Sequence, residues 1–274
     1  MPELPEVETI ARALAPALLG HSVERVAVHA ARLRAPLAAA SFRPLVGRPF
    51  REVRRRAKFI LAATEGPMLV IHLGMTGSLR MAGAGEARRK HDHAEFFLDD
   101  GQALVYNDPR RFGLLECLPD GAAFATAHAD LGVEPLEREF SGKWLFERSR
   151  KIATPIKPWL MKQEVVVGVG NIYACEALFL SGIAPKRAAQ SLSADECASL
   201  ARHVKNVLRQ SIKSGGTTFS DYRQLNGEEG HFVQKLSVYG RAGQPCPRCG
   251  APIERCVQGG RSTFFCPHCQ GAGV

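Results

Sequence analysis

The chain has 274 residues, 45% of them hydrophobic, so it is long enough to bury a full core in one large or two modest domains, and a disordered or fibrous protein is excluded. No apolar run approaches the roughly 20 residues that span a bilayer, and the N-terminus is acidic where a secretory signal would be basic, so we expect a soluble cytoplasmic protein. The 36 Lys and Arg against 27 Asp and Glu give a net charge of +9, which favours a polyanionic partner but fits a merely basic surface as well.

The first predicted element is a helix that begins almost at the first residue. Apolar side chains recur at helical spacing at Val7, Ile10, Leu14 and Leu18. A proline and acidic residues precede this stripe and Gly20 follows it, as is usual at the two ends of a helix.

The pattern then changes to short β-rich runs over residues 53–118, such as 68–73, 95–98 and 103–106. The sequence Asp-Asp-Gly at 99–101 is a turn signal between the last two runs. This part of the chain therefore predicts an assembly of antiparallel sheets.

Helical patterns take over after a stretch of Gly, Pro and mixed charge at 119–142. Asn171 is expected to cap a helix over 172–181, and Ser193 with Glu196 forms a capping box for the next helix. Together the patterns predict an α+β multidomain protein with a boundary near 132–142.

The eight cysteines divide into four scattered residues and two closely spaced pairs. The pairs are separated by 16 residues and consist of Cys246, Cys249, Cys266 and Cys269. This spacing is typical of a four-thiolate zinc ribbon rather than of four ordinary buried thiols. Because four protein ligands leave no open coordination position, we expect one structural zinc ion with no catalytic role.

Pro2 becomes the N-terminal residue if processing removes Met1, and it then carries a secondary amine with a pKa of about 8. Such an amine can attack a sugar carbon and form a cationic iminium, for which Glu3 is a possible proton donor. A proline near a helix start is common without any such chemistry.

Five stretches of the chain resemble the motifs of formamidopyrimidine-DNA glycosylases, the bacterial enzymes that excise oxidised purines. The first is Met1-Pro-Glu-Leu-Pro-Glu-Val-Glu-Thr9, and the others follow in the family's order over 54–59, 72–80, 108–113 and 167–174. The C-terminal cysteine pairs complete the set, so the resemblance covers essentially the whole chain.

The resemblance implies three domains: an N-terminal antiparallel β-sandwich with flanking helices (1–132), a helix-two-turn-helix domain (133–236) and a zinc finger (237–274). It implies a monomer that binds double-stranded DNA containing oxidised bases. The activity implied is removal of 8-oxoguanine or formamidopyrimidines through a Schiff base, followed by β,δ-elimination.

The resemblance also implies a role for each site residue. Pro2 would be the nucleophile and Glu3 the acid that opens the sugar, while Lys58 and Arg261 would assist the eliminations. Without the resemblance, Lys58 would be only part of a solvated charge run.

A flipped nucleotide leaves a hole that wedge residues fill. Met75, Arg110 and Phe112 match the family's filler triad, in which Arg would hydrogen-bond the orphaned base. The resemblance implies backbone contacts for a further set: His72, His91, Lys151, Asn171 and Tyr239.

A loop near 217–222 resembles the family's lesion-capping loop, so the implied lesion pocket comprises Glu6, Thr217, Phe219, Ser220, Asp221 and Tyr222. Two positions depart from the family's pattern. Members often carry a basic residue where Ser220 stands and an acid where Lys162 stands.

Two alternatives stay open at this point. The endonuclease VIII branch shares Pro2, Glu3 and the finger but prefers oxidised pyrimidines, and Leu4 with the filler triad favours the purine branch. A DNA-binding protein without catalysis would need the basic surface but neither the N-terminal amine nor Glu3.

Overall fold

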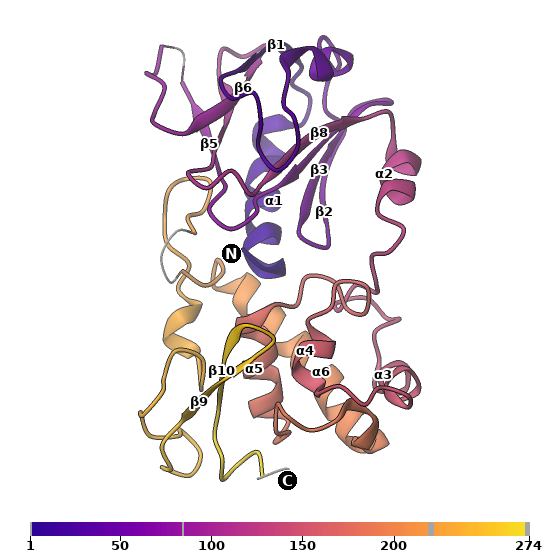
Figure 1. Ribbon diagram of the computed structural model, residues 1–274. Helices are drawn as coiled ribbons and strands as arrows, with labels where there is room; N and C mark the ends of the chain where they lie inside the picture. Colours follow the sequence, from indigo (N-terminus) through magenta and orange to yellow (C-terminus); the bar gives the residue numbers. More distant parts are fainter. Residues whose placement is uncertain (1, 84, 219–221, 272–274) are drawn as a thin grey trace. The chain divides into compact units, whose positions relative to one another are not determined.

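The computed structural model describes residues 2–83, 85–218 and 222–271, and the chain separates into two compact units. Unit 1 comprises Met1–Ala129 and Ser214–His231, and unit 2 comprises Asp130–Lys213 and Phe232–Val274. Figure 1 shows the elements of each unit and labels most of them as in the text below. Within the described ranges, no helix has both the length and the apolar character needed to cross a membrane.

Unit 1 contains two antiparallel sheets, which the structure describes as four strands each, with the orders β1-β6-β7-β5 and β2-β3-β4-β8. The strands are β1 (Val23–Val28), β2 (Glu52–Arg56), β3 (Phe59–Ala63), β4 (Met68–His72), β5 (Ser78–Ala82), β6 (Asp92–Leu98), β7 (Ala103–Asn107) and β8 (Leu114–Leu118). The helices are α1 (Leu4–Leu18), α2 (Gly121–Ala127) and the 3-10 helix η1 (Ala39–Leu45). The expected antiparallel sheets are confirmed, and β1 is an addition, because the prediction placed the first strand near residue 53.

Helix α1 follows the predicted stripe closely. Val7, Ile10, Leu14 and Leu18 are all buried and join one core cluster with side chains from both sheets, among them Ile60. The helix also contains Pro16, which has no backbone N–H to donate, and it ends two residues later. The core of unit 1 therefore holds the start of the chain in place through α1.

Unit 2 is mainly helical. Its helices are α3 (Gly142–Ser149), α4 (Ile156–Leu160), α5 (Asn171–Leu180) and α6 (Ala194–Lys213), with the 3-10 helices η2 (Ala189–Ser191) and η3 (Phe232–Lys235), and β9 (Glu254–Gln258) pairs with β10 (Arg261–Phe265) in a hairpin.

The expected capping box before α6 is confirmed. The Ser193 amide donates to Glu196 Oε2 at 2.8 Å, and the Glu196 amide donates to Ser193 Oγ at 3.2 Å. The expected cap of α5 is wrong, because Gly170 is the N-cap and Asn171 is the first helical residue. The Asn171 side chain is used elsewhere, as described below.

The three-domain division stays a prediction. The two compact units divide the chain after Ala129, and they assign 214–231 to the unit that contains the N-terminus.

Candidate active site and metal centre

The N-terminal segment of unit 1 is fixed by the Glu6 carboxylate. Pro2, Glu3 and Glu6 are all buried, with Glu3 3% and Glu6 2% exposed. Glu6 Oε2 accepts a hydrogen bond from the Glu3 amide at 2.8 Å, and Glu6 Oε1 accepts one from the Thr217 amide at 2.8 Å. One carboxylate thus joins the start of the chain to a segment 211 residues later.

Gly216 permits this approach of the 214–231 segment. Its φ is +87°, and a Cβ there would lie 3.2 Å from Glu6 Oε1 and 3.0 Å from Tyr222 Cε1. Tyr222 donates to the Gly215 carbonyl at 3.1 Å, and burial together with the Glu6 carboxylate raises the pKa of its hydroxyl. The tyrosine therefore stays protonated and acts as a donor inside the segment.

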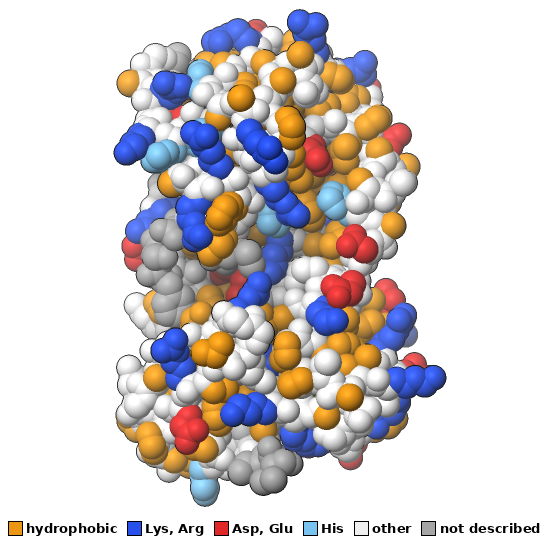
Figure 2. Space-filling model, viewed as in Figure 1, with side chains coloured by type: hydrophobic (Ala, Val, Ile, Leu, Met, Phe, Trp, Pro, Cys, Tyr) orange, Lys and Arg blue, Asp and Glu red, His pale blue; other side chains and the backbone are white. Residues whose placement is uncertain are grey.

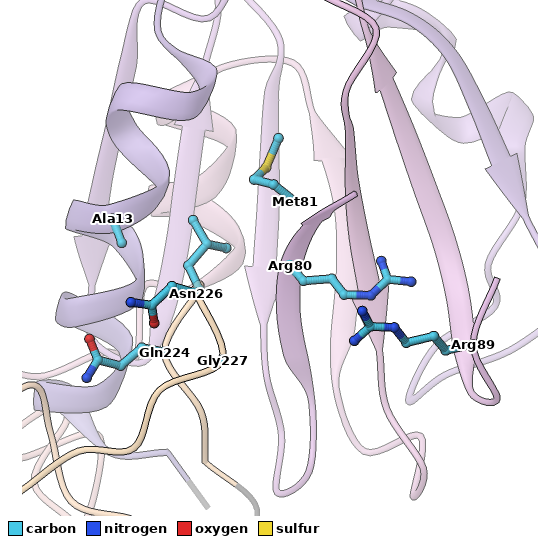
Figure 3. Close-up of a pocket in the computed structure, with 8 residues that line it drawn as sticks. Ala13, Arg80, Met81, Arg89, Gln224, Asn226 and Gly227 are labelled. Atoms are coloured by element: carbon cyan, nitrogen blue, oxygen red, sulfur yellow. The ribbon is translucent and has the colours of Figure 1, made fainter. Parts of the chain in front are cut away.

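The returning segment also borders a cavity of about 490 Å³ in unit 1. Its lining comes from α1 at Ala13, from β5 at Arg80 and Met81, and from the loop at 224–227 (Figure 3). Loop 224–227 thus faces the same helix that carries Glu6.

Lys58 lies in the turn between β2 and β3, where Ala57 has a positive φ of 54°. The Lys58 side chain is only 7% exposed and is close enough to His72, at the end of β4, to lower the pKa of that imidazole. Sequence alone offered a solvated charge run as the alternative for Lys58, and the burial of this lysine contradicts that alternative.

His72 has a defined tautomer. Its Nδ1 accepts a hydrogen bond from the Gly74 amide at 3.0 Å, so the ring proton resides on Nε2. Burial is the largest cause that lowers the pKa of His72 to about 4, followed by nearby positive charge from Lys58. At neutral pH the ring is therefore uncharged and presents an Nε2–H donor.

The predicted filler residues lie on two loops that are pressed together. A Cβ at Gly74 would lie 2.5 Å from the backbone carbonyl carbon of Phe112, so only glycine allows this contact. Met75 is 37% exposed, Phe112 is 48% exposed, and the guanidinium of Arg110 lies 4.7 Å from the centre of the Phe112 ring. The structure thus brings the three side chains to neighbouring positions on the surface of unit 1.

Asp108 holds the loop that carries Arg110 and Phe112. Its buried carboxylate accepts from the Gly113 amide at 2.9 Å, from the Arg110 amide at 3.2 Å and from Thr76 Oγ1 at 2.5 Å. The side chains of Arg110 and Phe112 are therefore exposed, whereas the backbone of their loop is fixed by hydrogen bonds to Asp108.

His91 precedes a second buried carboxylate, Asp92. Asp92 Oδ2 accepts from Arg80 Nη2 at 2.6 Å and from the Arg89 amide at 2.7 Å, and Oδ1 accepts from Asn107 Nδ2 at 2.9 Å. His91 itself has a φ of 70°, a conformation that this anchored segment maintains.

In unit 2, the Asn171 side chain links α5 to the finger hairpin. Its Oδ1 accepts from Lys157 Nζ at 2.5 Å, and its Nδ2 donates to the Ser262 carbonyl at 2.8 Å and lies 3.4 Å from the Tyr239 hydroxyl. Lys157 is 1% exposed and also donates to Thr263 Oγ1 at 2.7 Å. Sequence reasoning missed Lys157, whose only signal is a lysine inside an apolar run.

Glu176 on α5 fixes the chain just before the finger. Its carboxylate accepts backbone N–H groups of Ser237, Val238 and Tyr239 at 2.8 to 2.9 Å. Burial raises the pKa of Glu176 although these three donors oppose the shift. This residue too was missed, because a single Glu on a helix gives no sequence signal.

The remaining predicted site residues do not form one group. Arg261 is exposed at the start of β10, and Lys151 is exposed after α3. Phe219, Ser220 and Asp221 lie outside the described residues. The structure thus gathers Pro2, Glu3 and Glu6 with Thr217 and Tyr222 in unit 1, and Asn171 with Tyr239 in unit 2.

The four predicted metal ligands converge on one point. The sulfur atoms of Cys246, Cys249, Cys266 and Cys269 all lie within 4.8 Å of one another, with 3.8 Å between Cys246 and Cys269 and 3.5 Å between Cys249 and Cys266. A tetrahedral ion with bonds of about 2.3 Å to sulfur requires sulfur separations of roughly 3.8 Å. The donor set and its spacing therefore fit a zinc ion.

Three successive parts of the chain match models of known protein families. Residues 1–115 match the formamidopyrimidine-DNA glycosylase N-terminal domain, residues 131–223 match the helix-two-turn-helix domain of the same enzymes, and residues 243–271 match the zinc finger found in these glycosylases and in isoleucyl-tRNA synthetase. The formamidopyrimidine-DNA glycosylase of Serratia proteamaculans is 50% identical over 271 residues, which covers 98% of this chain and 100% of the relative. The chain belongs to the formamidopyrimidine-DNA glycosylase family. The enzyme of the same name from Yersinia pseudotuberculosis is 49% identical, again over 98% of this chain and all of the relative.

Solved structures of formamidopyrimidine-DNA glycosylases agree with this assignment. The enzyme from Thermus thermophilus is 42% identical and superposes with a TM-score of 0.88 over 100% of both chains. The wild-type enzyme from Lactococcus lactis, in complex with DNA containing N7-benzyl-Fapy-dG, is 33% identical with a TM-score of 0.90 over 98% of this chain and 99% of the other. The family match confirms the zinc-finger prediction for the four cysteines and the predicted fold class.

Proposed function

We propose that this chain is a DNA glycosylase of base excision repair that removes oxidised purines from double-stranded DNA and then cleaves the abasic strand. The observation that carries the proposal is the buried Pro2 and Glu3 pair, held by Glu6, in a chain that its relatives match from end to end. The formamidopyrimidine-DNA glycosylase of Lactococcus lactis forms complexes with damaged DNA. Because genomic DNA is the substrate, the protein would work with the nucleoid in the bacterial cytoplasm.

The Pro2 amine is the proposed nucleophile once Met1 has been removed. Its nitrogen forms a bond to C1′ as the bond from C1′ to the damaged base breaks, and the departing base takes up the proton that the amine loses. Glu3 then donates a proton to the sugar ring oxygen, the bond from C1′ to that oxygen breaks, and the nitrogen lone pair forms the iminium. The resulting iminium withdraws electrons from the sugar, so a base can remove the C2′ proton and the 3′ phosphate leaves. The Glu6 carboxylate acts on this chemistry through position, because it holds the Glu3 amide.

Lys58 and His72 are the proposed contacts to the phosphate at the lesion. The buried ammonium supplies charge, whereas the neutral imidazole supplies a directed Nε2–H donor. A neutral donor binds a phosphate oxygen without the desolvation cost of a second buried cation beside Lys58.

Met75, Phe112 and Arg110 are the proposed wedge. Two exposed apolar side chains replace the stacking of a flipped nucleotide, and the guanidinium beside the Phe112 ring reaches the unpaired base. Zinc held by the four cysteines would keep the finger folded, with Arg261 at the start of its second strand as a phosphate contact. On the face drawn in Figure 2, Lys and Arg side chains outnumber Asp and Glu, a distribution that favours phosphate binding.

The deciding experiment is borohydride trapping on a duplex with one 8-oxoguanine, followed by mass spectrometry of the adduct. We expect a covalent product on Pro2 in the processed chain and none on Pro2 in a matched chain that retains Met1, because the Pro2 nitrogen is then an amide and is not nucleophilic. An adduct on a lysine contradicts the proposed nucleophile. Excision of oxidised pyrimidines in preference to 8-oxoguanine would assign the chain to the endonuclease VIII type of substrate instead.

A further inference from the structure

A small cavity of about 190 Å³ lies in unit 2 beside the loop that joins β9 to β10. Lys157, Lys162 and Arg261 line it, together with Gln258 and Gly259, and Pro158 and Met161 complete its wall. A water molecule in liquid occupies about 30 Å³, so this space accommodates one tetrahedral anion with part of its hydration shell. Three of the seven lining residues are cations.

The charges of Lys162 and Arg261 are only partly balanced by nearby carboxylates. Lys162 lies 3.7 Å from Glu164 Oε1, but both side chains are more than half exposed, so water screens their attraction. Arg261 has no carboxylate oxygen within 4.0 Å in the part of the chain that the structure describes. Lys157 donates to the neutral oxygens of Asn171 and Thr263, which hold its ammonium at a fixed place. The cavity is therefore a place of positive potential.

The backbone leaves the cavity accessible. Gly259 and Gly260 have φ values of +54° and +72°, and a Cβ at either position would meet nothing within 4 Å. Gln258 is held by its Nε2, which donates to the Pro185 carbonyl at 3.1 Å, while its buried Oε1 has no partner among the described residues. A buried acceptor of this kind can bind a water molecule that hydrates an anion.

We propose that this cavity binds a phosphate group of the DNA backbone, with Lys162 as a contact additional to Arg261. The proposal rests on the proposed function, since it needs DNA as the partner. A backbone phosphate fits because the cavity offers cations and an open glycine loop, but only two apolar side chains against which a base could stack. Lys162 thereby gains a role that its departure from the family pattern left without explanation.

The test compares Lys162→Glu with Lys143→Glu as a matched control. Lys143 is also a lysine of unit 2 with a glutamate partner, Glu147, at 3.9 Å, so both variants make the same change of charge. The dissociation constant for an oxidised duplex is measured by fluorescence anisotropy from 50 to 400 mM salt. We expect Lys162→Glu to reduce the salt slope by about one and Lys143→Glu to leave it near that of the wild type. Equal slopes for the two variants overturn the proposal.

A second variant and a second ligand keep the result interpretable. Lys162→Gln is expected to show the same loss of slope with wild-type zinc content and unfolding temperature, which separates a lost contact from a misfolded domain. Inorganic phosphate binding is followed by ³¹P NMR at constant ionic strength. If Lys162→Glu abolishes phosphate binding yet leaves the DNA salt slope unchanged, the cavity binds a free anion and the proposal is wrong. If the wild-type chain binds no oxidised duplex at all, the proposed function itself fails.

Discussion

In unit 1 the start of the chain is held by backbone amides that donate to one buried carboxylate, whereas in unit 2 the finger holds four thiols around a single point. In unit 1 the bonding groups all belong to the protein, and helix α1, which follows them, packs into the large core formed with the two sheets. The finger contributes few apolar side chains, chiefly Val238 and Ile253, and these pack against Phe179 of α5. The position of the candidate nucleophile therefore depends on hydrogen bonds within the protein, whereas the folding of the finger depends on a metal ion.

The largest expected effect comes from removing one metal ligand. Cys249→Ser should abolish zinc binding and unfold the finger, because binding of a structural zinc ion contributes on the order of 10 kcal/mol to folding. DNA affinity should fall by more than an order of magnitude while the sheets of unit 1 stay folded. Zinc content and circular dichroism measure this, with Cys256→Ser, a half-buried cysteine outside the cluster, as the control. Unchanged zinc in Cys249→Ser would refute the ligand assignment.

The second prediction removes a hydrogen-bond acceptor from the N-terminal segment instead of a metal ligand from the finger. Glu6→Gln replaces one acceptor oxygen by an amide nitrogen, so either the Glu3 or the Thr217 amide loses its partner while buried. An unsatisfied buried donor costs about 1 to 3 kcal/mol, and we expect the free energy of unfolding to fall by that amount with zinc content unchanged. Denaturant titration measures it against Glu52→Gln, an exposed residue of β2. Equal stability of the two variants contradicts the holding role of Glu6.

Arg110→Ala tests a third arrangement, an exposed side chain on a backbone fixed by Asp108. Stability should change little, but discrimination between cytosine and adenine opposite the lesion should weaken by about 1 to 3 kcal/mol, the value of one good base contact. Excision opposite each of the four bases, at two salt concentrations, measures this. A uniform loss against all four bases would make Arg110 a backbone contact and not a base reader.

The smallest expected effect is the pH dependence from His72. Its pKa is about 4 in the folded chain against about 6.5 in the unfolded chain, so between these values only the unfolded chain binds the proton. The contribution of the neutral ring to the free energy of unfolding is fully present above pH 6.5 and is lost as the pH falls towards 4. For a partly exposed ring we expect a loss on the order of 1 to 2 kcal/mol, and His72→Asn should remove it. Urea titrations at pH 7 and 4.5 compare the two chains, and equal losses would contradict the assignment.

The features predicted correctly from the sequence are those that depend on residues close together in the chain. The stripe of α1, the capping box of Ser193 and Glu196 and the four cysteines were all predicted from short spacings, and each is present in the structure. In these cases the residues that interact are near one another in the chain, so a periodic pattern is enough to find them.

Long-range contacts gave no such signal. Lys157 was missed because its partner Thr263 lies 106 residues away. Residues 214–231 belong to unit 1, where Thr217 bonds to Glu6 and Tyr222 joins the core, and these partners are more than 200 residues apart in the chain. Asn171 was placed as a helix cap because that is the local preference of asparagine, but its side chain bonds instead to Lys157 and the finger. The roles proposed for Pro2, Glu3 and the wedge stay predictions that the experiments above address.

The hydrogen bond between Thr217 and Glu6 has a consequence for the order of events during synthesis. On a ribosome the nascent chain must be extended by more than two hundred residues before the Thr217 amide can reach the Glu6 carboxylate. Until then the N-terminal segment lacks this hydrogen bond, and closing so long a loop carries an entropic cost. The proposed nucleophile requires a peptidase to remove Met1, and we expect this processing to precede formation of the bond between Thr217 and Glu6, because residues 214–231 are synthesised so late.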